Sequence, residues 1–462
     1  MVKQFANVYG LLLVSLVFFL LPISSLSYSG QFYTVHRHKY PFRRVLLGHE
    51  YEHYAVIFDA GSTASRVHVF RFDQNLDLLP IGDDVELYAS TQPGLSSYAD
   101  DPQAAASSIR PLLEKAEAVV PIELQPDTPA RLGATAGLRL LNGDAAEKIL
   151  EEVRKLFKHE STLKYKDDWV SILDGVQEGT YMWVTVNYLL NTLGKSYSET
   201  SATIDLGGAS VQMAYAISEE NANKSPQVIA NETYVLQKNL KGTNYNLYVH
   251  SYLSYGSKAA RAEIFKASRN STNPCILEGY EGTYTYGGVV YKASAPPTGT
   301  NMRRCRMLTR KALKINAPCK YEKCTFNGIW NGGGGDGQKN LYLSSSFYWT
   351  ALDLGILKQN ATAGRIRLNA YKDTAKRACA TKVSNVISEF PDVQKDDIPY
   401  VCMDLVYIYT LLVDGFGLDA SEKVSVVKQV TYKNSQLEAA WPLGCAIDVI
   451  SSLTTKTSIE DI

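Results

Sequence analysis

The sequence has no excess of charge of either sign. Its 462 residues include 47 Lys and Arg and 47 Asp and Glu, so the formal net charge is +0. A protein that binds nucleic acid normally carries a basic excess, and the balance argues against that class. The composition, 45% hydrophobic and 20% charged, excludes a disordered or fibrous chain. A single hydrophobic core is unusual at this length, and we expect two lobes or domains.

Cysteine is missing from the first half of the chain. All seven cysteines lie between Cys275 and Cys445, and none forms a CxxC pair or stands at zinc-finger spacing from a histidine. A metal cluster is therefore a poor interpretation, and disulfides suit the pattern better. The sequence leaves the connectivity open, but we expect Cys445 to be free and the pairs to be Cys319–Cys324, Cys379–Cys402 and Cys275–Cys305.

Long apolar runs are missing after the N-terminus. Residues 11–23 are apolar but too few for a comfortable membrane span, and Ser25 and Ser27 fit a cleavage site. We predict a signal peptide over residues 1–27 and a secreted protein. The alternative is an uncleaved signal anchor in the Golgi or plasma membrane.

No later stretch is expected to cross a membrane, and residues 28–53, which have no clear period, are interpreted as a loose leader. Four Asn-x-Ser/Thr sequons predict a secreted glycoprotein, namely Asn223, Asn231, Asn270 and Asn360.

The familiar phosphate-binding loop is missing as well. It requires G-x-x-x-x-G-K-[ST] before a helix. The run "GKS" at 194–196 has Leu189 where the first glycine is needed, and "GGGGDGQK" at 332–339 has Gln338 in place of lysine. A dinucleotide-binding fold is also disfavoured, because the glycine turns of this chain lead into strands rather than helices.

The patterns that are present alternate between strands and helices, which predicts an α/β fold. Pro111 is expected to break or kink one of the helices, and Asp144 and Asp174 are expected to cap two others. Strands are predicted at 55–72, 170–173 and 202–217, and helices at 103–119, 144–157, 174–194, 401–414 and from 439 onward. The remaining segments 265–330 and 331–338 are expected to be loop-rich and irregular, respectively.

Two of the strand pairs are alike. "IFDAGSTAS" and "TIDLGGAS" each place an aspartate, Asp59 or Asp205, after an apolar strand and before a glycine and small or hydroxyl-bearing residues. Small residues let backbone N–H groups approach a phosphate, and hydroxyls add donors. An aspartate at a strand end can hold a hydrated divalent cation. The two units together predict a clamp for a polyphosphate, although either turn alone is more often a plain hairpin.

Two further segments carry candidate site residues. "LGATAGLRLL" at 132–141 offers Thr135 among small residues, and "ILDGVQEGTY" at 172–181 places Glu178 in the first turn of a helix. The helix dipole alone favours an acid at that position, so Glu178 also has a purely structural interpretation.

Five segments in this order resemble the apyrases, the nucleoside triphosphate diphosphohydrolase family. They are "IFDAGSTASR", "LGATAGLRLL", "ILDGVQEGTYMWVTVNYLL", "IDLGGASVQMAY" and "FNGIWNGGGGDGQ". The resemblance covers nearly all of residues 55–450 and is strongest to the soluble plant type, particularly that of legumes. It implies a two-lobed actin- and hexokinase-like fold with nucleotide between the lobes. Lobe I would comprise residues 54–174 and 436–462, and lobe II residues 175–435.

The resemblance also implies roles for particular residues. Glu178 would activate the attacking water, and Asp59 and Asp205 would hold Ca²⁺ or Mg²⁺, largely through water. Tyr348 and Tyr407 would stack on the nucleobase. The positions that match residues around the phosphates are Gly61, Ser62, Thr63, Ala64, Thr135, Gly207, Gly208, Ala209, Ser210 and Gln212.

The expected reaction is hydrolysis of the terminal phosphate of nucleoside tri- and diphosphates, with AMP as the end product from ATP. A glutamate with its reference pKa of about 4.3 would be ionised at neutral pH and could accept a proton from water. We expect a monomer. The alternatives are a receptor or lectin-like role toward an oligosaccharide signal, a filament-forming or chaperone-like member of the same fold, and hydrolysis of polyphosphate or guanosine polyphosphates.

Overall fold

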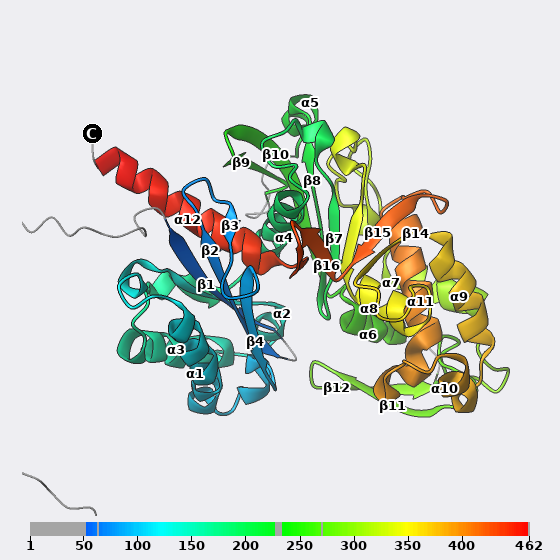
Figure 1. Cartoon of the computed structure of the whole chain (residues 1–462). Helices are drawn as coiled ribbons and strands as arrows, with labels where there is room; N and C mark the ends of the chain where they lie inside the picture. The colour runs from blue at the N-terminus through cyan, green and yellow to red at the C-terminus, as the bar shows by residue number, and fades with distance from the viewer. Residues whose placement is uncertain (1–51, 62–63, 227–232, 269–270, 461–462) are drawn as a thin grey trace, which may run out of the picture. The chain divides into compact units, whose positions relative to one another are not determined.

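The computed structural model describes residues 52–61, 64–226, 233–268 and 271–460, which belong to one compact unit. The predicted signal peptide, nearly all of the leader, Ser62, Thr63 and the sequons Asn231 and Asn270 lie outside the described residues. The predicted fold class is confirmed, because helices cover both faces of two mixed sheets (Figure 1).

The first sheet has the strand order β3-β2-β1-β5-β6, with β4 also paired to β2. Strands β1 and β2 form an antiparallel hairpin, while β5 and β6 run parallel to β1. Because the carboxyl ends of parallel strands meet at one edge of a sheet, the residues that follow β1, β5 and β6 lie close together. The strands are β1 (His53–Ala60), β2 (Ser65–Phe72), β3 (Leu78–Leu79), β4 (Glu86–Thr91), β5 (Ala130–Ala134) and β6 (Val170–Ile172).

The second sheet repeats this arrangement. Strands β7 and β8 form the second antiparallel hairpin, and β13 runs parallel to β7, as β5 runs parallel to β1. The order is β14-β15-β13-β7-β8-β10-β9. The strands are β7 (Thr203–Leu206), β8 (Ser210–Ile217), β9 (Val235–Leu240), β10 (Thr243–Leu253), β13 (Tyr342–Ser345), β14 (Ala363–Arg367) and β15 (Lys423–Val427).

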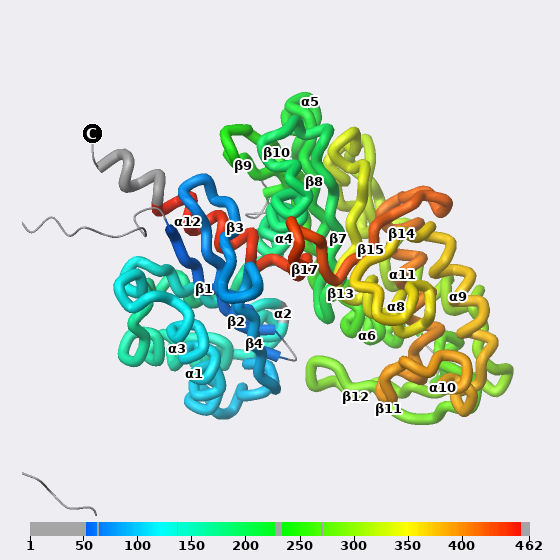
Figure 2. The backbone as a smooth tube through the Cα atoms, viewed as in Figure 1, coloured from blue at the N-terminus to red at the C-terminus, as the bar shows by residue number. Residues whose placement is uncertain are grey.

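Two helices, α4 (Gly175–Leu189) and α12 (Trp441–Glu460), lie between the sheets and share one apolar cluster with the inner face of each (Figure 1). In Figure 2 the red C-terminal helix α12 runs beside the blue strand β1, although the two are far apart in the sequence. The outer face of the first sheet is covered by α1 (Pro102–Val119) and α3 (Ala145–Glu160). The outer face of the second is covered by α6 (Ser257–Ala267), α7 (Met302–Ala312), α8 (Ser346–Asp353), α9 (Asn369–Ala380) and α11 (Val401–Thr410).

Two of the sequence-based helix predictions need correction. Pro111 lies inside a continuous α1, because it is on the exposed side of the helix, where solvent can satisfy the carbonyl that loses its partner. Helix α4 ends at Leu189 rather than Gly194, which occupies the following turn with φ +90. The stretch 265–330 is loop-rich, as predicted, and it also contains the hairpin of β11 (Glu281–Tyr286) and β12 (Val289–Ser294) and helix α7.

The glycine-rich stretch 331–338 lies at the far end of β8 from Ser210. Gly332, Gly333, Gly334 and Gly335 all have positive φ, a conformation that favours glycine. A Cβ at Gly337 would lie 1.9 Å from the carbonyl oxygen of Ala216. This segment is irregular, as predicted, and its glycines serve close packing against the second sheet.

The three predicted disulfides are present, and the remaining thiol, Cys445, is free and buried.

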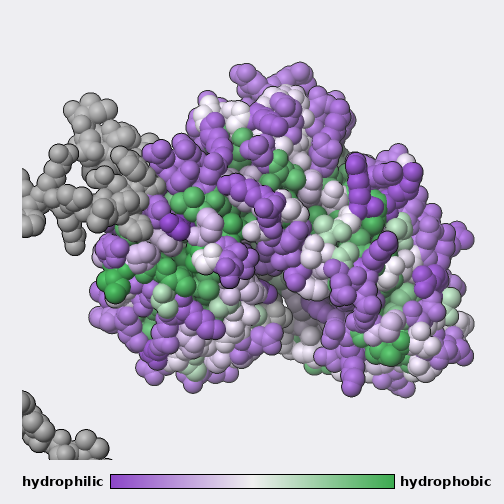
Figure 3. Space-filling model, in the orientation of Figure 1, coloured by the Kyte–Doolittle hydropathy of each residue, from purple (hydrophilic) through white to green (hydrophobic). Residues whose placement is uncertain are grey.

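The expectation about membrane spans needs a correction, because residues Lys395–Gly415 are long and apolar enough by composition to cross a membrane. The most apolar stretch of this segment is 78% buried inside the protein. The segment is therefore a core helix in the second half of the chain. The face in Figure 3 is mainly hydrophilic, with scattered apolar patches. The lobe boundaries at 174/175 and 435/436 stay a prediction.

The crossing of α4 and α12 yields a stability prediction. A Cβ at Gly444 would lie 2.1 Å from the carbonyl oxygen of Tyr181. Alanine forms helix better than glycine by about 1 kcal/mol, so helix propensity alone would make the variant more stable. A net loss of stability would therefore come from the clash. We expect Gly444→Ala to lower the free energy of unfolding by about 2 kcal/mol or more, measured by urea denaturation. Ser452→Ala, on the exposed side of the same helix, should change it by less than about 0.5 kcal/mol; equal effects would contradict the tight crossing.

Candidate active site

The two glycine hairpins face a common cleft. It has a volume of about 290 Å³ and is lined by residues from both sheets and from the segment that joins β15 to α12. The lining includes Asp59, Gly61, Arg66, Thr135, Glu178, Asp205, Gly207, Gly208, Ser345, Ser346, Tyr348, Trp349, Lys428, Glu438 and Trp441. Residues that are far apart in the sequence thus meet at the carboxyl ends of the parallel strands, where α/β sheets bind ligands.

The first hairpin holds Asp59 at the end of β1. Arg66, its cross-strand partner, donates from Nη1 to Asp59 Oδ2 over 2.9 Å, while Asp59 Oδ1 is buried and has no hydrogen-bond partner among the described residues. The Gly61 N–H already donates to the carbonyl of Ala64 at 3.0 Å, so it closes the turn rather than offering a donor to the cleft. A Cβ at Gly61 would lie 3.0 Å from that same carbonyl oxygen, which explains the glycine.

The second hairpin holds Asp205 at the end of β7. The neighbouring parallel strand β13 places Ser344 opposite it, and the Ser344 hydroxyl donates to Asp205 Oδ1 over 2.7 Å. Burial raises the pKa of Asp205, the serine hydroxyls oppose that effect, and the charge of Asp59 adds to it. The two aspartates are therefore near enough to repel one another across the cleft.

Glu178 enters the cleft from the first turn of α4. Asp174 begins this helix with a capping box, in which its side chain accepts from the N–H of Gln177, as the sequence predicts. Glu178 Oε2 accepts from Arg139 Nη2 at 2.5 Å and from Gln212 Nε2 at 3.2 Å. Burial raises the pKa of Glu178 to about 7, although Arg139 works against the rise. The pKa of Glu178 therefore lies above the reference value that the sequence analysis used for a glutamate.

The geometry of Asp59 and Asp205 fits a hydrated cation. Asp59 Oδ1 is a buried oxygen without a partner, and burial together with Asp59 raises the pKa of Asp205. Among the described residues no group of three or more His, Cys, Asp or Glu side chains surrounds one point that could hold a metal. Two carboxylates with the remaining positions left to water suit Mg²⁺ or Ca²⁺ better than a transition metal.

Some of the predicted site residues line the cleft, and others lie elsewhere. Those that line the cleft are Asp59, Gly61, Thr135, Glu178, Asp205, Gly207, Gly208 and Tyr348. Ala64, Ser210 and Gln212 are buried behind it, and Ser210 and Gln212 hydrogen-bond to each other. Ala209 borders a second cavity of about 730 Å³, and Tyr407 borders a third of about 220 Å³.

Sequence reasoning missed several residues of the cleft. Arg66 lines the cleft and Arg139 contacts Glu178, and both arginines stand within the quoted motifs. Ser345 is the last residue of β13, which pairs with β7, and Ser346 follows it, so the strand-end rule could have found both. Trp349 and Lys428 lie on separate elements, and the Lys428 ammonium lies 5.3 Å from the Trp349 ring centre. No local pattern marks that pair.

Comparison with known proteins agrees with this arrangement. The chain is 58% identical over 453 residues to "Apyrase" of Solanum tuberosum, covering 98% of each sequence. It is 52% identical to "Nucleoside-triphosphatase" of Pisum sativum, covering 96% of this chain and 97% of the relative. The fold matches the crystal structure of nucleoside triphosphate hydrolases from Neospora caninum, with a TM-score of 0.60 at 12% identity over 87% of this chain and 93% of the other. Residues 45–461 match a single family model, and the chain belongs to the GDA1/CD39 (nucleoside phosphatase) family.

Proposed function

We propose that this chain is an apyrase: it hydrolyses the terminal phosphate of nucleoside triphosphates and diphosphates and releases the monophosphate. The observation that carries the proposal is the position of Glu178, a buried carboxylate that enters the cleft between two glycine hairpins. Family membership supports the same reaction, since relatives at 58% and 52% identity are named apyrase and nucleoside-triphosphatase.

The hairpins supply the phosphate site. Phosphoryl transfer through a loose transition state needs alignment and charge neutralisation more than strong covalent chemistry. Gly207 and Gly208 line the cleft on one side, and Thr135 lines it on the other. Their backbone groups and the Thr135 hydroxyl can donate to phosphate oxygens without the bulk of larger side chains. Substrate phosphates thus lie between donors that belong to different sheets.

Glu178 and Gln212 position the attacking water. The Gln212 amide donates to Glu178 Oε2, and its Oε1 is buried without a partner, so the pair offers two acceptors for one water. The water oxygen attacks the terminal phosphorus as the bond to the bridging oxygen breaks, and Glu178 takes the water proton. Arg139 favours the ionised form of Glu178 that this step requires.

Asp59 and Asp205 would hold the divalent cation, Ca²⁺ or Mg²⁺, partly through water. Such an ion supplies neutralisation of the negative charge on the phosphates. Asp205 is oriented for this by Ser344, and Asp59 by Arg66. The protein's own part in the step is to orient both carboxylates and to shield them from bulk water.

The nucleoside end of the substrate is best assigned to Trp349. Tyr348 and Tyr407 are each 3% exposed, and their hydroxyls bind backbone carbonyls, so neither ring is free to stack. Trp349 is 47% exposed and lines both the cleft and the adjoining cavity of about 220 Å³. We assign base stacking to this indole, in place of the two tyrosines.

Secretion is the setting we propose for this reaction. The three disulfides and the exposed sequons Asn223 and Asn360 support it. The similarities to known proteins give no support to the oligosaccharide-receptor alternative. The monomeric state stays a prediction.

The reaction class is tested by phosphate release from ATP, ADP, AMP and tripolyphosphate. We expect release from ATP and ADP with Mg²⁺ or Ca²⁺, none from AMP, and loss of activity with a chelator that added metal restores. Glu178→Gln should keep the fold and lower kcat by at least about a hundredfold, because the proton acceptor is lost. Turnover of AMP, activity that survives the chelator, or a fully active Glu178→Gln would each contradict the proposal.

Arg139 sets the pH dependence. It lowers the pKa of Glu178 against the effect of burial, so its loss should raise that pKa. In Arg139→Gln the acidic limb of kcat should move to higher pH by roughly one pH unit or more, measured as the pH profile of phosphate release. Arg139→Lys keeps the charge and should leave the limb near its original position. A profile unchanged in Arg139→Gln would show that the pair does not control Glu178.

Trp349 should matter for nucleotides alone. Loss of one base–aromatic stacking contact is worth about 1–3 kcal/mol, so Trp349→Ala should raise KM for ATP at least about fivefold. KM for tripolyphosphate, which has no base, should stay the same. Tyr348→Phe removes only the buried hydroxyl contact to Ala361 and should leave KM for ATP unchanged. The assignment would be wrong if Trp349→Ala left KM for ATP unchanged.

A further inference from the structure

The turn of the second hairpin takes its backbone orientation from the beginning of α6. The Ser257 N–H donates to the carbonyl of Gly207 at 2.8 Å, and the Lys258 and Ala259 N–H groups donate to the carbonyl of Gly208 at 2.9 and 3.0 Å. In a trans peptide the N–H points opposite to the C=O. The N–H groups that follow these carbonyls, at Gly208 and Ala209, therefore point away from α6.

Helix α6 packs tightly against the turn of the second hairpin. A Cβ at Gly256, the residue before α6, would lie 2.4 Å from the backbone nitrogens of both Ala209 and Ser210. Backbone thus packs on backbone, and no flexible side chain lies between to absorb a shift. A displacement of the first turn of α6 is transmitted directly to the donors of the Gly207–Ala209 turn.

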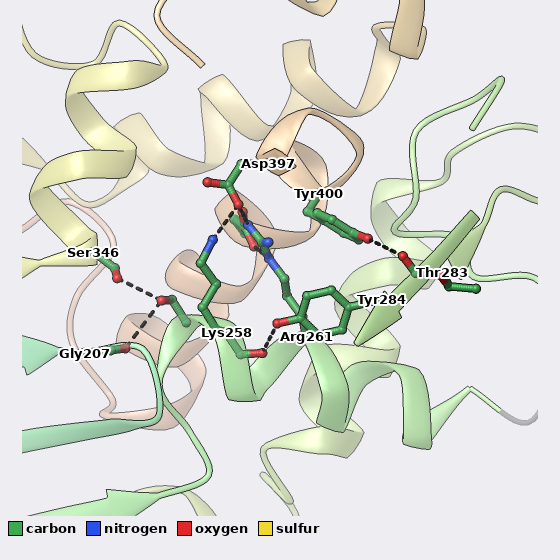
Figure 4. A network of polar contacts seen from close by, with 10 residues as sticks. Gly207, Lys258, Arg261, Thr283, Tyr284, Ser346, Asp397 and Tyr400 are labelled. Carbon is green, nitrogen blue, oxygen red and sulfur yellow. Dashed lines mark hydrogen bonds and ion pairs between the residues drawn. The ribbon is translucent and has the colours of Figure 1, made fainter. Parts of the chain in front are cut away.

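One buried guanidinium fixes the first turn of α6 in place. Arg261 is 4% exposed and donates from Nε and Nη2 to the two oxygens of Asp404 at 2.8 and 2.5 Å. It also lies 2.8 Å from Asp397 and 4.4 Å from the ring centre of Tyr400 (Figure 4). Burial alone would raise the pKa of Asp397, but Arg261 and then Lys258 hold it below its ordinary value. Asp404 lies on α11, and Asp397 and Tyr400 on the 3-10 helix that precedes it, η8 (Lys395–Tyr400).

Weaker contacts reach the same turn of α6 from other elements. The Tyr284 hydroxyl, on β11, donates to the carbonyl of Lys258 at 2.6 Å, and the Ser257 and Ser346 hydroxyls lie 2.9 Å apart (Figure 4). Arg261 and Lys258 both contact Asp397, and both border the cavity in which Trp349 and Tyr407 lie. The network therefore joins the wall of that cavity to the phosphate turn.

We propose that Arg261 is a positioning residue of the phosphate site: its bidentate pair with Asp404 fixes the start of α6, and α6 orients the Gly207–Ala209 turn so that the turn's N–H groups face the cleft. This inference rests on the proposed function for the identity of the ligand as a nucleotide phosphate. Its structural part, the dependence of the turn on Arg261, can be measured without any substrate.

The chain provides a matched control for this pair. Arg306 on α7 donates from Nε and Nη2 to Asp414 at 3.1 and 2.8 Å, and lies 5.3 Å from the ring centre of Tyr409. This pair has the same chemistry in the same half of the molecule, but Arg306 lies on another helix. Lysine keeps the charge and cannot form the two-pronged bond, so Arg261→Lys and Arg306→Lys remove the same kind of pair at two places. The Arg306 side chain is 34% exposed and that of Arg261 only 5%, so the control pair is the more exposed of the two.

The first measurement is hydrogen exchange of the amides at 257–259, which donate to the turn. We expect exchange in Arg261→Lys to be about tenfold faster than in the wild type, and exchange in Arg306→Lys to stay within twofold. Tyr284→Phe, which removes one hydroxyl from the network, should accelerate the same amides about threefold and decides the question if Arg261→Lys does not fold. Unchanged exchange in the folded variants, or equal acceleration in Arg306→Lys, would overturn the inference.

The second measurement separates positioning from general stability. With ATP and Mg²⁺, Arg261→Lys should lower kcat about tenfold while KM changes less than threefold, because alignment of the transferred phosphate is affected more than binding of the nucleoside. Arg306→Lys should keep both constants within twofold, and the loss of Tm is measured for both variants. A kcat loss as large in Arg306→Lys would assign the effect to stability and overturn the inference. Absence of phosphate release by the wild type would refute the proposed function, and hydrogen exchange would still decide the role of Arg261.

Discussion

The site depends on one packing constraint, the tight seating of α4 between the second sheet and α12. A Cβ at Gly175 would lie 2.0 Å from the Ser251 hydroxyl oxygen, and one at Gly179 would lie 3.0 Å from the side chain of Val249. These two glycines flank Glu178, so the helix lies flush against β10 at the point where its carboxylate enters the cleft. On the other side Gly444 of α12 allows equally close contact. Helix α4 therefore has little freedom to translate, and Glu178 is held by backbone packing as well as by its own partners.

The second governing feature is the imbalance of charge in the cleft. Glu178, Asp59 and Asp205 converge on a buried space, and the guanidinium groups of Arg66 and Arg139 each pair with one carboxylate. Burial penalises the charged forms, and it raises the pKa of both Glu178 and Asp205. By itself such a surface repels a polyphosphate. A divalent cation reverses the local sign, and this is the physical reason that metal and substrate belong together at this site.

Much of this site could be predicted from local sequence patterns, and the rest depends on contacts between residues far apart in the sequence. The Asp-x-Gly turns and the Asp174 cap were predictable because each depends on a few neighbouring residues. The expected disulfide pairs join cysteines that are 30, 5 and 23 residues apart, and the structure confirms them. The helix break expected at Pro111 is not found, because tolerance of proline in a helix depends on whether the proline faces solvent. Trp349 is 47% exposed and its neighbour Tyr348 only 3%, a difference that only the folded chain shows. Resemblance to a family suggested the roles, and our proposal of Trp349 over Tyr348 as the stacking residue rests on that exposure.

The covalent links of the chain are confined to one side of the molecule. Each disulfide joins cysteines no more than 30 residues apart, and the unpaired thiol, Cys445, lies on α12 in the central layer. Burial raises the pKa of Cys445 to about 12, although Arg131 works against the rise. Thiol–disulfide exchange requires a thiolate with access to a disulfide, and Cys445 offers neither. Once the three bridges have formed, the folded chain has no accessible thiol of its own that could reshuffle them.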